Sequence, residues 1–353
     1  MSKSCKYCLN DYTVKKIKIS KNGKCNFCNT YDEYYDKLHD YEALEKLFLK
    51  KIDNKEGYDY DAAVGFSGGK DSTYVLYKLV KEYKLKIYAY TLDNGFLSDE
   101  AKVRIDEIVK ELNIDHEYIE CDIVLLKKVY KQITTKYLSP CIACSFLGYA
   151  VMINEASRVN AKVGIHGRST YQMFRNFSKD VDDVFKPFIL SGLEECVDLS
   201  KLYEGVLNKI GILVDKNLKK EIEEKLLKDA FEKGFREFVA YFLYHPYHKE
   251  DVINFLKTNT IWNYNTEAEH FDCLIHYGAW YLKSLTARRD HALPEYSVMI
   301  RERHLTIDEA RKLLNNKIDI KRAKKELKLF CKYSQVNYNR LMLKAKIYSK
   351  RWW

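Results

Sequence analysis

Short apolar runs alternate with longer amphipathic stretches between about residue 60 and residue 167. The apolar runs predict strands over residues 60–66, 86–93, 116–121 and 162–167. The stretches between them predict helices over residues 72–83, 98–112 and 144–159. Because parallel neighbours need crossover connections, this order predicts an α/β fold, a parallel sheet with helices on both faces. Ligands of such sheets bind at the carboxyl ends of the strands.

The pattern divides the chain into four predicted parts. They are a cysteine-rich segment over residues 1–31, the α/β domain over residues 32–192, an aromatic-rich region over residues 193–315 and a basic tail over residues 316–353. The third part contains the runs FEKGFREFVAYFLYHPYH and HFDCLIHYGAWYLK. These runs predict a C-terminal helical subdomain whose aromatic side chains form its core.

The net charge of +10 is concentrated in the basic tail. Residues 317–353 contain 12 Lys and Arg against 2 acidic residues, which gives +10, so the rest of the chain is close to neutral. The tail predicts either a solvated helix or a contact with a partner. The sequence contains no signal-peptide pattern and no run of 18 apolar residues, so we expect a cytoplasmic protein with no membrane insertion.

Two CxxC pairs open the chain, Cys5 with Cys8 and Cys25 with Cys28. Two such pairs joined by a short hairpin can supply four thiolates in the tetrahedral geometry of a zinc site. A segment this short also needs such a staple to be ordered. We therefore expect a ribbon or knuckle that holds Zn²⁺, with four unrelated buried cysteines as the alternative.

A glycine-rich string follows the first predicted strand. It consists of Ser67, Gly68, Gly69, Lys70, Asp71 and Ser72. Paired glycines let backbone N–H groups approach an anion, the helix N-terminus adds its dipole, and Lys70 adds a positive charge. The string therefore predicts a phosphate-binding loop, with a surface turn as the alternative. Its spacing differs from GxxxxGK followed by Ser or Thr, so it is not a Walker A loop.

With SGGKDS after its first strand, the sequence resembles the PP-loop ATP pyrophosphatases, the adenine nucleotide alpha hydrolase-like superfamily. These enzymes cleave ATP between the α and β phosphates, adenylylate a substrate oxygen, and let nitrogen or sulfur displace AMP. The resemblance implies that the six loop residues surround the pyrophosphate, with Lys70 and Asp71 catalytic and Asp71 near Mg²⁺. It also implies that Asp93, at the end of the second strand, contacts nucleotide or metal.

The order of further motifs is similar to that of the bacterial N-acetyl sugar amidotransferases of surface-polysaccharide and pseudaminic acid biosynthesis. The motifs are the opening cysteine pairs, SGGKDS, Pro140-Cys141-x-x-Cys144, Arg289-Asp290-His291-Ala292 and Leu305-Thr306-x-x-Glu309-Ala310. The resemblance extends from about residue 3 to about residue 314 and leaves out the basic tail.

This finer resemblance implies an ATP-dependent amidotransferase acting on an acetamido sugar. The enzyme would adenylylate the N-acetyl carbonyl oxygen and replace it with ammonia-derived nitrogen, releasing AMP and pyrophosphate. A separate glutaminase subunit would supply the ammonia, because no glutaminase region is found in the chain. His291, next to Asp290, is a candidate for phosphate or sugar contact or for proton transfer.

The fourth predicted strand departs from the family pattern. It is followed by Gly167 and Arg168, where the family would place an acidic or amide residue. We expect both residues at the ATP site, where Arg168 could grip a phosphate or a sugar carboxylate. The alternative is a surface arginine.

The third CxxC pair, Cys141 and Cys144, supports a different enzyme. The two cysteines precede a predicted helix near the strand ends, where a helix N-terminus would lower thiol pKa values. With Cys273, or less readily Cys196, they could hold a [4Fe-4S] cluster with one open iron site. PP-loop enzymes that thiolate transfer RNA carry such a cluster.

Three functional hypotheses therefore remain open at this point. Besides the amidotransferase, the third CxxC pair allows a sulfurtransferase that acts on tRNA or a small molecule. The structural alternative for this pair is two reduced cysteines at the start of a packed helix. A zinc-stapled module that binds nucleic acid without catalysis is the third hypothesis.

Overall fold

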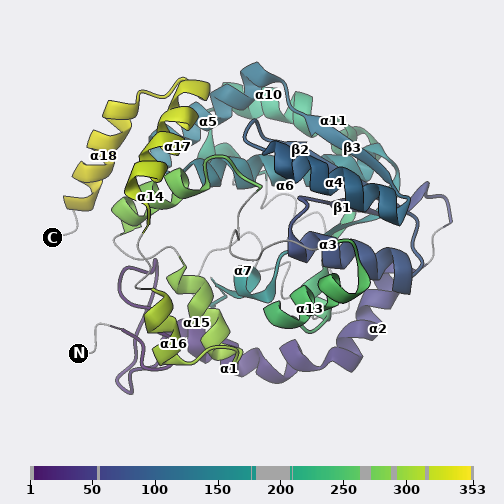
Figure 1. Cartoon of the computed structure of the whole chain (residues 1–353), viewed down its shortest axis with the longest axis horizontal. Helices are drawn as coiled ribbons and strands as arrows, with labels where there is room; N and C mark the ends of the chain where they lie inside the picture. Colours follow the sequence, from purple (N-terminus) through teal and green to yellow (C-terminus); the bar gives the residue numbers. More distant parts are fainter. Residues whose placement is uncertain are drawn as a thin grey trace.

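The computed structural model describes most of the chain and contains one sheet, whose labelled strands lie in the upper right of the view (Figure 1). The described residues are 4–53, 56–175, 177–179, 207–208, 210–262, 272–287, 292–314 and 318–350, with residues 349 and 350 described by their backbone alone. Of the predicted domain boundaries, the one after residue 31 falls inside the first helix, and those after residues 192 and 315 lie outside the described residues.

Five strands form the sheet in the order β3-β2-β1-β4-β5, and every neighbouring pair is parallel. The strands are β1 Tyr60–Gly65, β2 Ile87–Asp93, β3 Asp115–Glu120, β4 Ala161–His166 and β5 Glu237–Ala240. β1 lies in the middle, and its residue Val64 aligns with Ala89 on one side and with Ile165 on the other. All three side chains are fully buried, as expected for strands that are covered on both faces.

Crossover helices cover the two faces of the sheet. They are α3 Lys70–Tyr77 with its π-helical extension Lys78–Glu82, α4 Asp99–Leu112, α5 Ile123–Tyr137 and α6 Pro140–Arg158. The chain steps from β1 to β3 in one direction and returns to β4 in the other, so right-handed crossovers place α3 and α4 on one face and α5 and α6 on the opposite face. The predicted α/β fold with helices on both faces is confirmed.

Further helices surround this unit. They are α1 Asn26–His39, α2 Tyr41–Ile52, α7 Thr170–Phe174, α10 Lys216–Leu226, α11 Lys228–Lys233, α12 Tyr241–Tyr244, α13 Lys249–Asn259, α14 His276–Ala287, α15 Leu293–Arg301, α16 Ile307–Leu313, α17 Ile320–Tyr333 and α18 Tyr338–Lys350. α10 and α11 pack on α5 and α6, whereas α13 packs on α3. No helix in the described ranges has the length and hydropathy to span a lipid bilayer.

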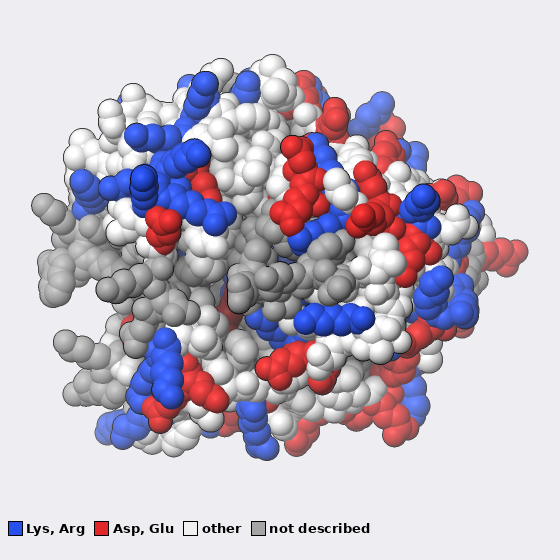
Figure 2. Space-filling view, viewed as in Figure 1, with Lys and Arg blue, Asp and Glu red and all other residues white. Residues whose placement is uncertain are grey.

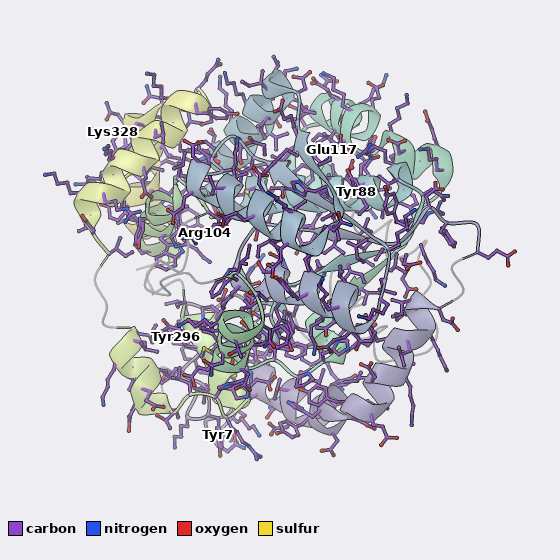
Figure 3. The ribbon with its side chains drawn as sticks, turned by 45° about the vertical axis from the view of Figure 1, so that its right-hand side comes forward. Tyr7, Tyr88, Arg104, Glu117, Tyr296 and Lys328 are labelled. Carbon is purple, nitrogen blue, oxygen red and sulfur yellow. The ribbon has the colours of Figure 1, made fainter. Side chains whose placement is uncertain are left out.

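A polar cluster ties α6 to the edge of the sheet. Tyr88 and Glu117 come from neighbouring strands and lie next to each other (Figure 3), and the Tyr88 hydroxyl donates to Oε2 of Glu117 at 2.8 Å. Arg158, at the end of α6, pairs with Glu117 and with the buried Glu155. Tyr88 and Glu117 lie on their strands before the carboxyl ends.

The fifth strand lies in a segment for which the aromatic pattern predicts helix. Phe238 of β5 pairs with Gly164 of β4, and a Cβ on Gly164 would lie 2.1 Å from the Phe238 ring. The missing side chain therefore makes room for the ring. The helical prediction is wrong for residues 237–240, because pairing with the open edge of β4 outweighs the local pattern.

The basic tail folds into α17 and α18, which pack on α14. Its apolar residues Leu327, Phe330 and Leu341 are buried, and Figure 2 shows lysine and arginine side chains gathered on the surface over this region. Gly278 of α14 makes the contact close, because a Cβ there would lie 2.7 Å from the backbone nitrogen of Leu327.

We predict that Gly278→Ala destabilises the protein by about 1–3 kcal/mol, since the added methyl group pushes α14 and α17 apart. Gly148→Ala, inside α6, is the matched control, because a Cβ there would meet nothing within 4 Å. Alanine's higher helix propensity should stabilise that control by up to about 1 kcal/mol. Urea denaturation of the full chain measures both changes, and equal effects of the two substitutions would contradict the prediction.

Candidate functional site

A glycine-rich turn connects β1 to α3. Gly68 adopts a φ of +74°, a left-handed conformation that favours glycine, and a Cβ there would lie 2.9 Å from Cγ1 of Ile105. Gly69 is the N-cap of α3 and offers no capping side chain. Within the described part of the chain, nothing accepts a hydrogen bond from the backbone N–H groups of residues 70–72. The start of α3 therefore presents three backbone donors.

The hydroxyl groups of this turn fix its shape. The Ser72 hydroxyl accepts a hydrogen bond from the Ser67 backbone N–H at 3.3 Å and donates to the Gly69 carbonyl at 3.2 Å. Thr73 donates to the same carbonyl at 2.9 Å. Ser67 is exposed, whereas Ser72 and Thr73 are buried. Hydrogen bonds among its own residues thus fix the turn, and the backbone N–H groups of residues 70–72 point away from α3.

Both carboxylate oxygens of Asp71 have partners. Lys70 Nζ lies 3.0 Å from Oδ2, and the Tyr247 hydroxyl donates to Oδ1 at 2.9 Å. Burial and the nearby Asp71 charge raise the pKa of Tyr247 well above its usual value, so its hydroxyl keeps the proton that it donates. Tyr247 comes from the segment between α12 and α13 and fixes the orientation of the Asp71 carboxylate.

The chain after β4 meets the start of α3. A Cβ on Gly167 would lie 3.1 Å from the carbonyl oxygen of Asp71 and 3.1 Å from Cα of Ser72. The strand order reverses between β1 and β4, and open α/β sheets bind ligands at the carboxyl edge at this position. Arg168 follows, with its guanidinium carbon 4.6 Å from the centroid of the Tyr149 ring. Gly167 and Arg168 therefore lie at the same edge as the loop.

Asp93 ends β2 at this edge and is paired within the chain. Its carboxylate accepts a hydrogen bond from the Gly95 backbone at 3.0 Å and lies 2.9 Å from Lys102 Nζ. The next residue, Asn94, donates from Nδ2 to the Cys144 sulfur at 3.2 Å. The end of β2 thus connects the predicted nucleotide residues with the cysteines at the start of α6.

Cys141, Cys144 and Cys273 come together beside the end of β2. Cys141 and Cys144 lie in the first turns of α6, and an antiparallel bridge with Leu97 brings Cys273 alongside. Burial is the largest cause of the raised pKa values of Cys141 and Cys273, and the charge of Cys144 is a smaller cause for both. Among the described residues, only the N-terminal cysteines form a group with all ligand atoms within 4.8 Å. The three thiols are therefore neighbours in a looser arrangement.

These three thiols have raised pKa values. Desolvation by the surrounding protein raises the pKa of Cys141 to about 11 and that of Cys273 to about 12, although Cys141 keeps exposed surface. Desolvation also raises the pKa of Cys144, against the hydrogen bonds from Asn94 and Tyr130. These directions are opposite to the expected lowering of the pKa values at the helix N-terminus, and desolvation is the largest cause for all three thiols.

The remaining candidates fall in segments that the structure leaves out. Arg289, Asp290 and His291 lie outside the described residues, and so does Cys196. Their predicted roles stay predictions.

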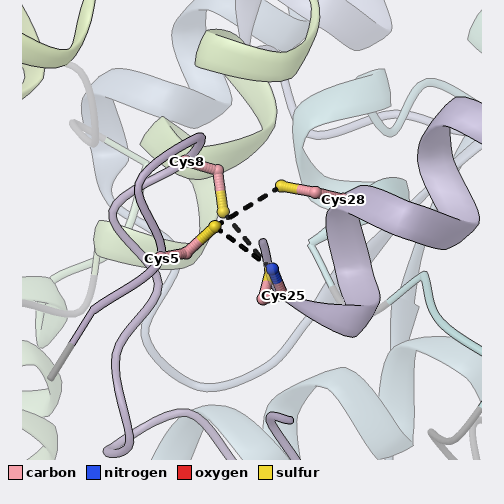
Figure 4. A group of neighbouring side chains, drawn as sticks. All are labelled: Cys5, Cys8, Cys25 and Cys28. Atoms are coloured by element: carbon pink, nitrogen blue, oxygen red, sulfur yellow. Dashed lines mark hydrogen bonds between the residues drawn. The ribbon is translucent and has the colours of Figure 1, made fainter. Parts of the chain in front are cut away.

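The four N-terminal cysteines converge on one point (Figure 4), and all are buried. The Cys5 and Cys28 sulfurs lie 3.9 Å apart, and those of Cys8 and Cys25 lie 3.6 Å apart. A tetrahedral site with a Zn–S distance of about 2.3 Å separates its sulfurs by roughly 3.8 Å. These two separations match a tetrahedral thiolate site, and all four sulfurs lie within 4.8 Å of one another.

The surroundings of this centre favour the ionised form of the Cys5 sulfur. The backbone N–H groups of Tyr7 and Cys25 donate to the Cys5 sulfur at 3.4 Å and 3.3 Å. Hydrogen bonds from Cys25 and Cys28 lower the pKa of Cys5, and those with Cys25 and Cys5 raise the pKa of Cys28. Since the first thiolates to form oppose ionisation of the others, four thiolates together need a cation.

Sequence reasoning missed three groups of this region. Arg301, at the end of α15, donates to the Cys28 sulfur at 3.9 Å although the two are 273 residues apart. Tyr247 holds Asp71, and Asn94 holds Cys144. None of the three belongs to a motif with fixed spacing. Asn94 alone could have been found from the sequence, because it is a polar residue directly after a predicted strand.

No protein-family model matches the chain. The chain is similar to the uncharacterized protein MJ1599 of Methanocaldococcus jannaschii, with 31% identity over 170 residues that cover 46% of this chain and 56% of that relative. The match thus spans little more than half the length of the relative.

Three solved structures are similar at low identity. The U34-tRNA thiolase NcsA of Methanococcus maripaludis with its [4Fe-4S] cluster is 15% identical, with a TM-score of 0.36 and 91% of both chains covered. The NH3-dependent NAD synthetase of Campylobacter jejuni is 15% identical, with a TM-score of 0.32 over 57% of this chain and 99% of that chain. The NMN synthetase of Francisella tularensis is 17% identical, with a TM-score of 0.25 over 54% of this chain and 94% of that chain. With TM-scores this low, the function of this chain is argued from its own site.

We predict that the purified protein carries one tetrahedral metal ion per chain, held by the four N-terminal thiolates. Cys8→Ser should lower the metal content and the thermal stability, because a structural metal stabilises the segment that binds it. Cys121→Ala, which removes a thiol outside the centre, should retain the metal. Elemental analysis measures both variants, and an unchanged metal content in Cys8→Ser would contradict the assignment.

Proposed function

We propose that this protein is an ATP pyrophosphatase, an enzyme that transfers AMP to a substrate oxygen and releases pyrophosphate. The main support is that Gly167 lies close to the backbone of Asp71 and Ser72. This approach places the loop after β1 beside the chain after β4, where the strand order reverses. Ligands of open α/β sheets bind at that position. The SGGKDS resemblance adds the reaction type.

The residues at this edge fit a polyphosphate. The three backbone donors of residues 70–72 lie at the N-terminus of α3, where the helix dipole favours anions. Gly69 leaves the approach open, since a Cβ there would meet only the Ser67 hydroxyl. Lys70 would exchange its present partner Asp71 for a phosphate oxygen and stabilise the charge that develops on pyrophosphate.

Asp71 is the residue best placed to hold Mg²⁺, which would neutralise the phosphates when bound with ATP. Its carboxylate is oriented by Tyr247 and lies beside Lys70. Asp93 and Arg168, at the same edge, are the further contacts that we propose for the nucleotide. Positioning and charge stabilisation would then provide most of the rate acceleration.

For the substrate we propose an acetamido sugar, on the motif order that resembles the N-acetyl sugar amidotransferases. The acetamido oxygen would attack the α phosphate, forming an O–P bond and releasing pyrophosphate. Ammonia would then add to the imidate carbon, and AMP would leave with the former carbonyl oxygen, giving an acetamidino group. A separate glutaminase subunit is the proposed source of ammonia.

Sulfur transfer is a second candidate. It is favoured by the position of Cys141 and Cys144 at the start of α6 and of Cys273 beside Leu97, after the end of β2. These thiols would bind an iron–sulfur cluster after losing their protons, and their raised pKa values mean that the metal must provide the driving force. The accepting oxygen, of tRNA or a small molecule, would again be adenylylated and then replaced by sulfur.

Lys70→Ala should abolish AMP formation, because it removes the only cationic side chain of the SGGKDS string. Lys81→Ala, an exposed lysine just after α3, is the control and should keep full activity. Labelled ATP and chromatography of the products measure both variants. A Lys70→Ala protein that makes AMP at the normal rate would disprove the phosphate-loop assignment.

The two candidates differ in their response to Cys141→Ala. An amidotransferase should form AMP with acetamido sugars and ammonia, and Cys141→Ala should not change its iron content. A sulfurtransferase purified without oxygen should contain iron and sulfide, which Cys141→Ala should remove together with AMP formation on thiolation substrates. Iron that is lost with Cys141 would overturn the amidotransferase proposal.

A further inference from the structure

Arg301 is a buried cation whose nearest counter-charges are the thiolates of the metal centre. Its side chain is buried and its Nη1 donates to the Cys28 sulfur at 3.9 Å. Among the described residues, Nε and Nη2 of its guanidinium have no hydrogen-bond partner. A buried guanidinium without a partner is costly, so Arg301 depends on the negative sulfurs.

The metal centre has the opposite charge. Four thiolates around a divalent ion carry a net charge of about −2, and Arg301 approaches them together with the Tyr31 ring, whose centroid lies 5.7 Å from its guanidinium carbon. Leu293 and Leu314, near the two ends of the segment 292–314, pack against the same cysteine cluster. The segment therefore contacts the centre by both charge and apolar surface.

The residues after Arg301 continue this contact toward the phosphate loop. Glu302 accepts a hydrogen bond from Tyr31 and lies 2.9 Å from His39 Nε2, both on α1. His304 Nδ1 lies 2.8 Å from the Tyr171 hydroxyl. The Tyr171 ring packs edge-on against that of Tyr247, with centroids 5.0 Å apart.

Tyr247 completes the connection, because its hydroxyl holds Asp71 at the start of α3. The step from Arg301 to His304 follows the chain itself, and each later link is a direct side-chain contact. Two of the residues that connect the cysteine cluster with α3, Tyr171 and Tyr247, are nearly fully buried. The path therefore runs largely through packed protein.

We propose that the metal-bound thiolates and Arg301 form a charge pair that docks residues 292–314, and that His304, Tyr171 and Tyr247 relay this docking to Asp71. The metal centre, far from Asp71 in sequence, is then a positioning element for the phosphate loop. Arg301 and Tyr171 are positioning residues, since they act through other groups. The proposal does not rest on the reaction that the protein catalyses.

The first test measures metal affinity in the full chain by competition with a chromophoric zinc chelator. Arg301→Met should weaken Zn²⁺ binding by about tenfold or more, as removal of an outer-shell partner does at other metal centres. Arg301→Lys should restore part of the affinity. The control Arg311→Met removes a charge from the exposed face of α16 and should bind zinc normally. Equal affinities of Arg301→Met and Arg311→Met would overturn the charge pair.

The second test measures amide hydrogen exchange in the wild-type chain, with zinc bound and after removal by a chelator, so it needs no folded Arg301 variant. Zinc removal should accelerate exchange at least several-fold in residues 293–301 and also in residues 70–77, and leave residues 123–137 of α5 unchanged. In Tyr171→Phe, which loses the bond to His304, zinc removal should affect residues 293–301 but not residues 70–77.

Two outcomes contradict the relay. Unchanged exchange in residues 70–77 after zinc removal would show that the centre does not position the loop. An equal response of Tyr171→Phe and wild type would show that the coupling takes another path.

Discussion

The chain after β4 passes so close to the start of α3 that a side chain at residue 167 would crowd the backbone of Asp71 and Ser72. A Cβ there would lie 3.1 Å from the carbonyl oxygen of Asp71 and from Cα of Ser72, and a side chain would push the loop away from the sheet edge. This approach fixes the position of the backbone donors of α3 relative to the strand ends. The electrostatics of the site follow from it, because Lys70, Asp71 and Arg168 are held at one edge.

The N-terminal cysteine cluster bears on the stability of a different part of the same fold, the segment before α1. Residues 4–25 contain little regular structure before α1 and cannot bury a large core by themselves. Four buried cysteine sulfurs within 4.8 Å of one another can replace that core by binding one metal ion, and the Arg301 guanidinium contacts the Cys28 sulfur. The N-terminal segment and α15 are thereby joined, and α15 in turn packs on α7, next to the end of β4.

Much of the fold and part of the site could be predicted from the sequence. The strands and the helices α3, α4 and α6 of residues 60–167 have clear periodicity, and SGGKDS and the cysteine pairs have fixed spacings, so their positions were predictable. The helix α5, Ile123–Tyr137, was not predicted. β5 was not predictable, because its four residues are stabilised by the edge of β4 and by the space over Gly164 rather than by their own pattern. Tyr247 and Arg301 act through tertiary contacts, and the raised thiol pKa values depend on desolvation that only packing creates.

The most direct test of the account is a crystal structure of the full chain with Mg²⁺ and an ATP analogue that cannot be cleaved between the α and β phosphates. The account predicts the β and γ phosphates at the backbone donors of residues 70–72, with Lys70 Nζ on a phosphate oxygen and the α phosphate directed toward Gly167 and Arg168. A nucleotide bound elsewhere, or bound here with its phosphates turned away from the start of α3, would contradict the central claim.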